Sequence, residues 1–222
     1  MNLLPFIAII LPLCYISVMP TEKRLNKIVS VLSRRQPDLR VVLEDVTIAH
    51  NASAVARTCE AVGVLNLHLI SREPEKVVFN EAISTRAEKW LNLIFHNTTE
   101  ECLSSFKEKG YRIAVTSLSG KTIPYTEIDY CQPMAIVFGN ESMGASKQAV
   151  SLADYAIQIP MVGMVQSLNL SVSVGIILYE AFRQRRERGF YSTCRLESEE
   201  YDRFLKDWLR NLKSRQPFNQ KK

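Results

Sequence analysis

Short apolar runs alternate with helix-like segments along most of this chain. The apolar runs are bounded by turn residues and predict buried strands at Val41–Val46, Val64–Ile70, Tyr111–Thr116, Met134–Phe138 and Tyr155–Pro160. Helical patterns lie between or after them, at Asn51–Val62, Glu81–Leu91, Thr99–Lys109, Ser146–Leu152 and Leu168–Arg188. Continuous apolar strands that alternate with helices are typical of parallel sheets covered on both faces. We therefore expect an α/β domain with a mostly parallel sheet and flanking helices.

Both ends of the chain carry a further amphipathic segment. Apolar positions spaced three and four apart predict a helix over Thr21–Arg34, which Thr21 caps and Pro37 closes. A stronger stripe of the same period runs from Tyr201 to Leu212, with basic residues on the other faces. This stripe needs a partner surface, and we expect its own domain or a second subunit, in preference to a membrane surface.

The charge is distributed unevenly. The formal net charge is +5, with a pI of about 9.0. Residues 19–40 hold six basic and two acidic residues, and residues 183–222 hold twelve and six. The stretch between them holds ten basic and fifteen acidic residues. Basic ends on an acidic middle suit binding to a phosphate backbone, although two solvated surface helices would give the same pattern.

The first residues form an apolar run, from Leu3 to Val18, that Pro5 and Pro12 interrupt. A signal peptide or membrane anchor is one interpretation. No basic residue precedes the run, and it is shorter than the roughly 20 residues of a membrane span. We expect translation to start at Met19 or the run to be a disordered tail, with no stable membrane association. The predicted organisation is a tail (1–18), a basic N-terminal helical extension (19–40), the α/β domain (41–190) and a basic C-terminal helical extension (191–222).

Cysteines and histidines give no metal signature. The five cysteines and three histidines are scattered, without a C-x-x-C or a cluster at ligand spacing. We interpret the thiols as reduced, which predicts a cytoplasmic protein with no metal site. Neither a G-x-G-x-x-G after the first strand nor a P-loop occurs, which disfavours dinucleotide enzymes and P-loop NTPases.

The first block with possible chemistry is His50-Asn51, followed six residues later by Arg57. Asn51 can cap the helix that follows, and Arg57 can be an ordinary surface side chain. The functional alternative is an arginine that grips a phosphate with two hydrogen bonds at the mouth of a site.

Two later blocks share a design in which a buried strand leads through a glycine-bearing loop into a helix. The second block runs from Met134 through Gly139 and Glu141 to Ser146, and the third from Ile157 through Asn169 to Glu180. Ligands of open α/β sheets bind at the carboxyl ends of strands, and glycine lets them approach the backbone. Taken alone, these two blocks indicate a ligand pocket.

Together the three blocks resemble the ordered motifs of the SpoU/TrmH family, in the SPOUT superfamily of RNA methyltransferases. They read N-x-x-x-x-x-R, F-G-N-E-x-x-G and I-P-M-x-G-x-x-x-S-L-N-x-S, and the resemblance runs from about Thr21 to about Arg188. The segment Arg34–Leu39 is similar to the TrmH branch, which acts on tRNA. The resemblance implies a SPOUT domain with a deep trefoil knot, a homodimer, and S-adenosyl-L-methionine (AdoMet) bound in the knot.

The same resemblance implies roles for individual residues. Those expected to hold AdoMet are Thr116, Gly139, Ile159, Met161 and Leu168. Those expected to serve catalysis and substrate placement are Asn51, Arg57, Glu141, Ser167 and Asn169. In the family the arginine is proposed to help deprotonate the ribose 2′-hydroxyl, but free arginine has a pKa above about 12, so orienting the hydroxyl beside a phosphate is the less demanding role.

The implied activity is 2′-O-methylation of guanosine 18 in the D-loop of tRNA. The basic helical extensions at the two ends of the chain would bind the tRNA. The alternatives are a ribosomal-RNA 2′-O-methyltransferase of the same family and a non-catalytic RNA-binding protein. One departure affects the local backbone: Arg86 stands where the family frequently has a glycine.

Overall fold

The computed structural model describes residues 20–71, 73, 79–118 and 120–212. The apolar run before Met19, and with it the predicted start of translation, lies outside the described residues. Within them, no helix combines the length and the apolar character needed to cross a membrane.

The described residues form one seven-stranded sheet in the order β3-β2-β1-β6-β4-β7-β5. Its strands are β1 (Gln36–Glu44), β2 (Val64–Ile70), β3 (Asn92–His96), β4 (Arg112–Thr116), β5 (Ile123–Pro124), β6 (Met134–Phe138) and β7 (Tyr155–Gln158). Every neighbouring pair is parallel, which confirms the predicted sheet. The predicted trefoil knot concerns the threading of the chain and stays a prediction.

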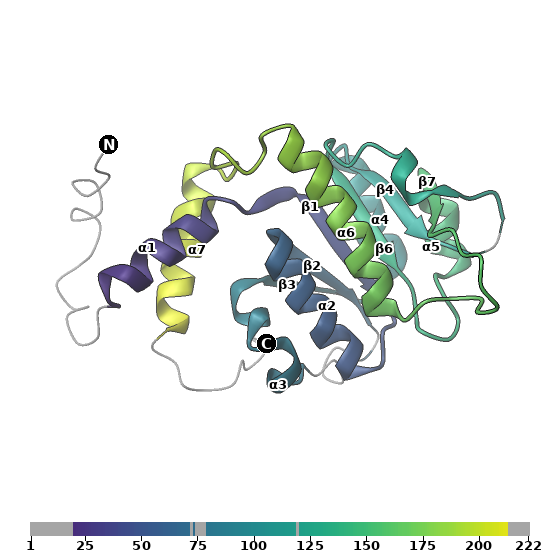
Figure 1. Ribbon diagram of the computed structural model, residues 1–222, viewed down its shortest axis with the longest axis horizontal. Helices are drawn as coiled ribbons and strands as arrows, with labels where there is room; N and C mark the ends of the chain where they lie inside the picture. Colours follow the sequence, from purple (N-terminus) through teal and green to yellow (C-terminus); the bar gives the residue numbers. More distant parts are fainter. Residues whose placement is uncertain (1–19, 72, 74–78, 119, 213–222) are drawn as a thin grey trace.

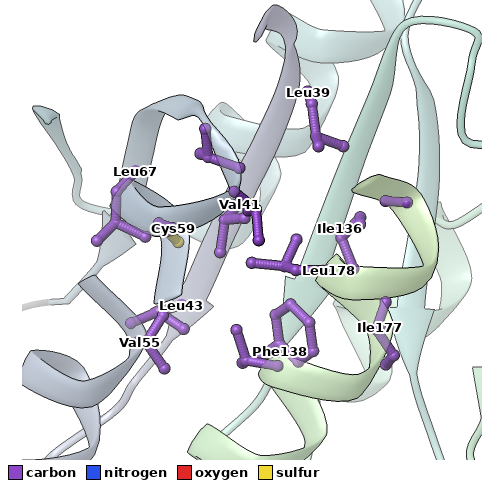
Figure 2. Packing of buried hydrophobic residues seen from close by; sticks show 14 of the residues in the cluster. Leu39, Val41, Leu43, Val55, Cys59, Leu67, Ile136, Phe138, Ile177 and Leu178 are labelled. Atoms are coloured by element: carbon purple, nitrogen blue, oxygen red, sulfur yellow. The ribbon is translucent and has the colours of Figure 1, made fainter. Parts of the chain in front are cut away.

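Helices cover both faces of the sheet (Figure 1). On one face lie α2 (Ala49–Val62) and α6 (Leu170–Glu187), and on the other lie α4 (Thr99–Glu108) and α5 (Lys147–Leu152). Alternate residues of β1 point to opposite faces, so Val41 packs with α2 and α6 whereas Val42 packs with α4. Figure 2 shows the first core, where side chains of β1, β6, α2 and α6 meet.

The two terminal helices, α1 (Glu22–Leu32) and α7 (Ser198–Asn211), pack side by side at one end of the molecule (Figure 1). Thr21 caps α1, as predicted, by accepting from the backbone N–H of Arg24. Phe204 and Trp208 of α7 are buried in a separate cluster with Ile28 and Leu32 of α1. The apolar stripe of the last helix is therefore covered by its own chain.

The first strand was predicted too short. It begins at Gln36 rather than Val41 and ends at Glu44 rather than Val46. Pro37 lies inside it, at a register irregularity, instead of merely closing the preceding helix. The pattern failed because the extra strand residues include polar ones: Gln36 and Asp38 accept hydrogen bonds from buried Arg185, a partner 147 or more residues away in the chain.

The segment predicted as one helix, Glu81–Leu91, is broken. It forms α3 (Glu81–Ser84) and the 3-10 helix η4 (Ala87–Trp90), separated by two left-handed residues, Thr85 and Arg86, with φ of 52° and 64°. Glycine adopts this conformation without strain, which explains why the family frequently has a glycine at the position of Arg86. The strands β3 and β5 and the short 3-10 helix η5 (Tyr125–Glu127) were not predicted.

Candidate active site

A cavity of about 280 Å³ opens at the carboxyl ends of β4, β6 and β7. The sheet places Thr116, Gly139 and Ile159 there, because they end or directly follow these strands. Met161 and Leu168 come from the loop between β7 and α6. All five residues predicted to hold AdoMet thus line one cavity.

The loop from β6 to α5 is held in a compact shape by its own polar groups. Asn140 and Gly144 exchange backbone hydrogen bonds of 3.0 and 2.9 Å. The Asn140 side chain accepts from the backbone N–H groups of Ser142 and Met143 and donates to the backbone oxygen of Asp45. This loop forms one wall of the cavity with a fixed backbone.

Gly139 is required by the loop itself. A Cβ atom at this position would lie 2.1 Å from the backbone nitrogen of Ala145 and 2.2 Å from the carbonyl carbon of Gly144. No side chain fits at such distances. The glycine was predicted as a place where a ligand approaches the backbone, but in the structure another part of the backbone already does so.

Three of the predicted catalytic residues form a hydrogen-bonded chain. Asn51 Nδ2 donates to Glu141 Oε1 at 3.0 Å, and Asn169 Nδ2 donates to Asn51 Oδ1 at 3.3 Å. Asn169 Oδ1 caps α6 by accepting from the backbone N–H of Ser171. The fold therefore joins motifs that lie 118 residues apart in sequence.

The suggested cap role of Asn51 was wrong. Helix α2 begins at Ala49 after Ile48, so Asn51 already lies in the first turn, and its buried amide reaches Glu141 instead. Glu141 Oε1 also accepts from the backbone N–H of Ile48 at 3.3 Å. A carboxylate at the start of a helix compensates free backbone N–H groups there, which is the task that a capping side chain would have performed.

The second oxygen of Glu141 has no partner. Oε2 is buried and accepts no hydrogen bond from the described residues. Of the described residues that line the cavity, Glu141 alone is ionisable. A buried carboxylate oxygen without a donor is costly, so this atom is suited to accept a hydrogen bond or a proton from a bound molecule.

The remaining two predicted catalytic residues, Ser167 and Arg57, lie outside this hydrogen-bonded chain. Ser167 lines the cavity from the loop before α6 and is exposed. Arg57 lies on α2, is exposed, and contacts the backbone oxygen of Ile83 at 3.5 Å. Arg57 neither lines the cavity nor hydrogen-bonds to the Asn51–Glu141–Asn169 chain within the described residues, so the structure does not join it to them.

Glu44 is a buried carboxylate that the sequence analysis did not single out. It ends β1, and its two oxygens accept from the hydroxyls of Thr99 and Ser146 and from the backbone N–H of Ser146. Ser146 in turn caps α5, directly after the cavity loop. Glu44 therefore fixes where that loop ends, a task with no local sequence signal because its partners lie far along the chain.

Residues 38–179 match the model of the SpoU rRNA Methylase family. The chain belongs to this family. The SpoU match spans the cavity and the Asn51–Glu141–Asn169 chain, and it confirms the family resemblance that the three motifs carried.

Among the SpoU relatives, a tRNA (guanosine(18)-2′-O)-methyltransferase of Thermus thermophilus is 47% identical over 190 residues, covering 86% of this chain and 97% of that protein. The Escherichia coli K12 protein of the same name is 41% identical over 168 residues, which cover 76% of this chain and 73% of that protein.

Solved SpoU structures confirm the fold class. The A. aeolicus TrmH/SpoU tRNA modifying enzyme superposes with a TM-score of 0.82 at 45% identity, covering 86% of this chain and 96% of that one. The SpoU methyltransferase AviRb from Streptomyces viridochromogenes, solved in complex with AdoMet, gives 0.59 at 26% identity, with 68% and 62% covered.

Proposed function

We propose that this protein transfers the methyl group of AdoMet to the ribose 2′-hydroxyl of guanosine 18 in tRNA. The observation that carries the proposal is the meeting of Asn51, Glu141 and Asn169 beside a cavity at the carboxyl ends of the strands. Relatives named for this reaction, 41–47% identical over most of the chain, support the substrate.

The cavity suits AdoMet. Its volume lies close to the lower limit of the range typical of small-molecule sites, about 300–1,000 Å³. Ile157, Ile159 and Leu168 would offer apolar walls to the adenine ring and the methylene arm, and the Glu141 carboxylate would favour the positive charge of the sulfonium. Thr116, Gly139 and Met161 complete the set that we assign to the co-substrate.

The reaction places distinct demands on the protein. AdoMet supplies an electrophilic methyl group, whose bond to sulfur breaks, with the electron pair staying on sulfur, as a bond to the ribose 2′-oxygen forms. The hydroxyl proton must leave, and we assign its acceptance to Glu141 Oε2, the unpartnered oxygen. We assign to Arg57 the binding of an RNA phosphate, which orients the hydroxyl.

Methylation of unmodified tRNA transcripts tests this assignment. We expect one 2′-O-methyl group at guanosine 18, and a loss of rate in Arg57→Ala, Glu141→Gln and Asn169→Ala of about 10²–10⁴-fold, the usual contribution of a positioned catalytic group. The measurement is single-turnover transfer from labelled AdoMet, with the modified nucleotide mapped. Methylation of ribosomal RNA but not tRNA would overturn the substrate, and tight tRNA binding without transfer would favour the RNA-binding alternative.

A second copy of the chain is the partner that we propose for the apolar surface near the cavity. Val162 and Met164 of the loop before α6 are fully exposed, and Val172 and Tyr179 of α6 are about half exposed. Apolar side chains gathered in this way mark an interaction surface. A homodimer would cover them. The four described cysteines are free, which fits the reducing cytoplasm where we place the enzyme.

A basic cavity of about 610 Å³ lies at the other end of α6 and supports tRNA binding. It is lined by Lys27, Arg34 and Arg186, which are exposed and form no ion pair with other described residues. The buried Arg35 at its base is neutralised by Glu60 at 3.1 Å. The three uncompensated cations suit RNA phosphates.

We expect Arg34→Ala and Arg186→Ala each to weaken tRNA binding and to reduce the slope of log affinity against log salt by about 1, because each removes one phosphate contact. Filter binding over a series of salt concentrations measures both effects. Arg112→Ala is the matched control, because this exposed arginine is paired with Asp154 at 2.9 Å and lies outside the basic cavity. An unchanged salt slope in both cavity variants would contradict phosphate binding there.

A further inference from the structure

Two of the scattered histidines and one cysteine meet in the fold. His68 lies on β2, His96 ends β3, and Cys102 lies on α4. Each offers one ligand atom, and the three atoms lie within 4.8 Å of one another. The shortest approach is 2.9 Å, between His68 Nδ1 and His96 Nε2. Nitrogen and sulfur ligands of these types are the ones that zinc prefers in proteins.

The distances are close to those that one metal ion imposes. Zinc binds histidine nitrogen at about 2.0–2.1 Å and cysteine sulfur at about 2.3 Å, so two tetrahedral ligands lie roughly 3–4 Å apart. The 2.9 Å between the imidazole nitrogens and the 4.8 Å limit for the group bracket this range. The three ligand atoms therefore lie near the spacing that one ion requires, although the two imidazole nitrogens must move slightly apart.

The protonation states favour the metal-binding forms of both imidazoles. Burial lowers the pKa of His68 to about 3 and also lowers the pKa of His96, so both rings are neutral at physiological pH. Neutral imidazole is the form that binds metals. Burial raises the pKa of the Cys102 thiol to about 12, so the ion must displace that proton, as metals do at protein thiols.

The charged surroundings are mixed. Arg40 and Lys109 repel a cation at His68, whereas Glu101 attracts one at His96. Glu44 and Glu101 both act on Cys102 and favour positive charge beside it. Phe106 lies edge-on against the His68 ring, with centroids 4.9 Å apart, and helps to exclude water. Two acidic groups thus offset two basic ones around the cluster.

We propose that His68, His96 and Cys102 form a binding site for a single zinc-like transition-metal cation, separate from the AdoMet cavity. The site joins β2, β3 and α4 at the edge of the sheet, whereas the cavity lies at β4, β6 and β7.

The metal would be linked mechanically to the cavity loop. Cys102 lies one turn of α4 after Thr99, whose hydroxyl donates to Glu44. Glu44 also holds Ser146 at the end of the loop from β6. Fixing α4 by a metal would therefore also fix Thr99, which donates to the Glu44 carboxylate that holds the end of that loop.

Cobalt binding to the untagged, metal-stripped full chain tests the proposal. Because thiolate ligation gives Co²⁺ a charge-transfer absorption that nitrogen and oxygen ligands lack, we expect this band to saturate at one cobalt per chain. Zinc should displace the cobalt and raise the melting temperature. The band should disappear in Cys102→Ser and persist in Cys194→Ser, whose exposed thiol lies outside the cluster.

His96→Gln provides a second variant should Cys102→Ser fail to fold, because His96 is only partly buried. We expect cobalt affinity to fall at least about tenfold in this variant, since a direct ligand matters no less than its supporting contacts. Absence of the charge-transfer band, or an unchanged band in Cys102→Ser, would overturn the proposal. The readout is metal binding, so it is independent of methyl transfer.

Discussion

Gly139→Ala is expected to abolish AdoMet binding. The added methyl group would lie 2.1 Å from the backbone nitrogen of Ala145, so the cavity loop would have to move away from β6. That movement breaks the backbone pairing of Asn140 with Gly144 and displaces Glu141. Because misplacement by about 1 Å can cost about 100-fold in rate, we expect kcat/KM to fall by about 100-fold or more. Equilibrium dialysis with AdoMet and single-turnover transfer measure the two effects.

Gly163→Ala is the matched control. Gly163 lies in the neighbouring cavity loop, and a Cβ atom there would have nothing within 4 Å. We expect AdoMet affinity to change little in this variant. Wild-type affinity in Gly139→Ala would show that the loop yields to the clash, contrary to the fixed backbone inferred from the Asn140 contacts.

Arg185→Ala is expected to give the largest loss of stability. The Arg185 side chain is fully buried, and its guanidinium donates to Asp38 Oδ1 at 2.7 Å, to Gln36 Oε1 at 3.2 Å, and to the backbone oxygens of Tyr130 and Gln132 at 2.8 and 3.2 Å. Removing one partner of a buried ion pair typically costs about 3–5 kcal/mol. Here the buried Gln36 side chain loses a donor, whereas Asp38 keeps one, because Arg195 donates to its Oδ2 at 2.8 Å. Urea unfolding measures this loss of free energy.

Arg183→Ala serves as the control, two residues earlier on the same helix. Arg183 is exposed and pairs with Glu180 and Glu187 on the surface of α6. Exposed pairs of this kind add little to stability, so its unfolding curve should match the wild type within error. If Arg185→Ala and Arg183→Ala unfold alike, the buried network does not hold β1 to α6 as the contacts indicate.

Strands made of apolar residues were predictable, and those built on polar pairs were not. The bounds of β2 and β6 were predicted to the residue: all their side chains are buried, and all except Asn66 and His68 of β2 are apolar. In β3 the end residues Asn92 and His96 bond to Asn66 and His68 of the neighbouring strand. A polar residue buried by such a partner resembles a loop residue until the partner is known.

In the candidate site, too, some features were predictable from the sequence and others were not. The motif resemblance placed five residues on one cavity, and the glycine-bearing loops alone had indicated a pocket. What could not be predicted is why each residue is needed. Asn51 was interpreted as a local cap, but its partner Glu141 lies 90 residues away. Glu44 carries no motif, and its importance rests on Thr99 and Ser146, which only the folded sheet brings to it.

The pairing of α1 with α7 sets an order of events during synthesis. Ile28 and Leu32 leave the ribosome early, whereas Phe204 and Trp208, which cover them, emerge roughly 170 residues later; at about 5–20 residues per second this interval lasts on the order of ten seconds or more. Leu65 and Trp90, which belong to the same cluster, are made much earlier, so until α7 arrives the apolar face of α1 is covered only in part. This cluster is therefore completed only when the last helix has been made, and until then its apolar residues are open to aggregation and to chaperones.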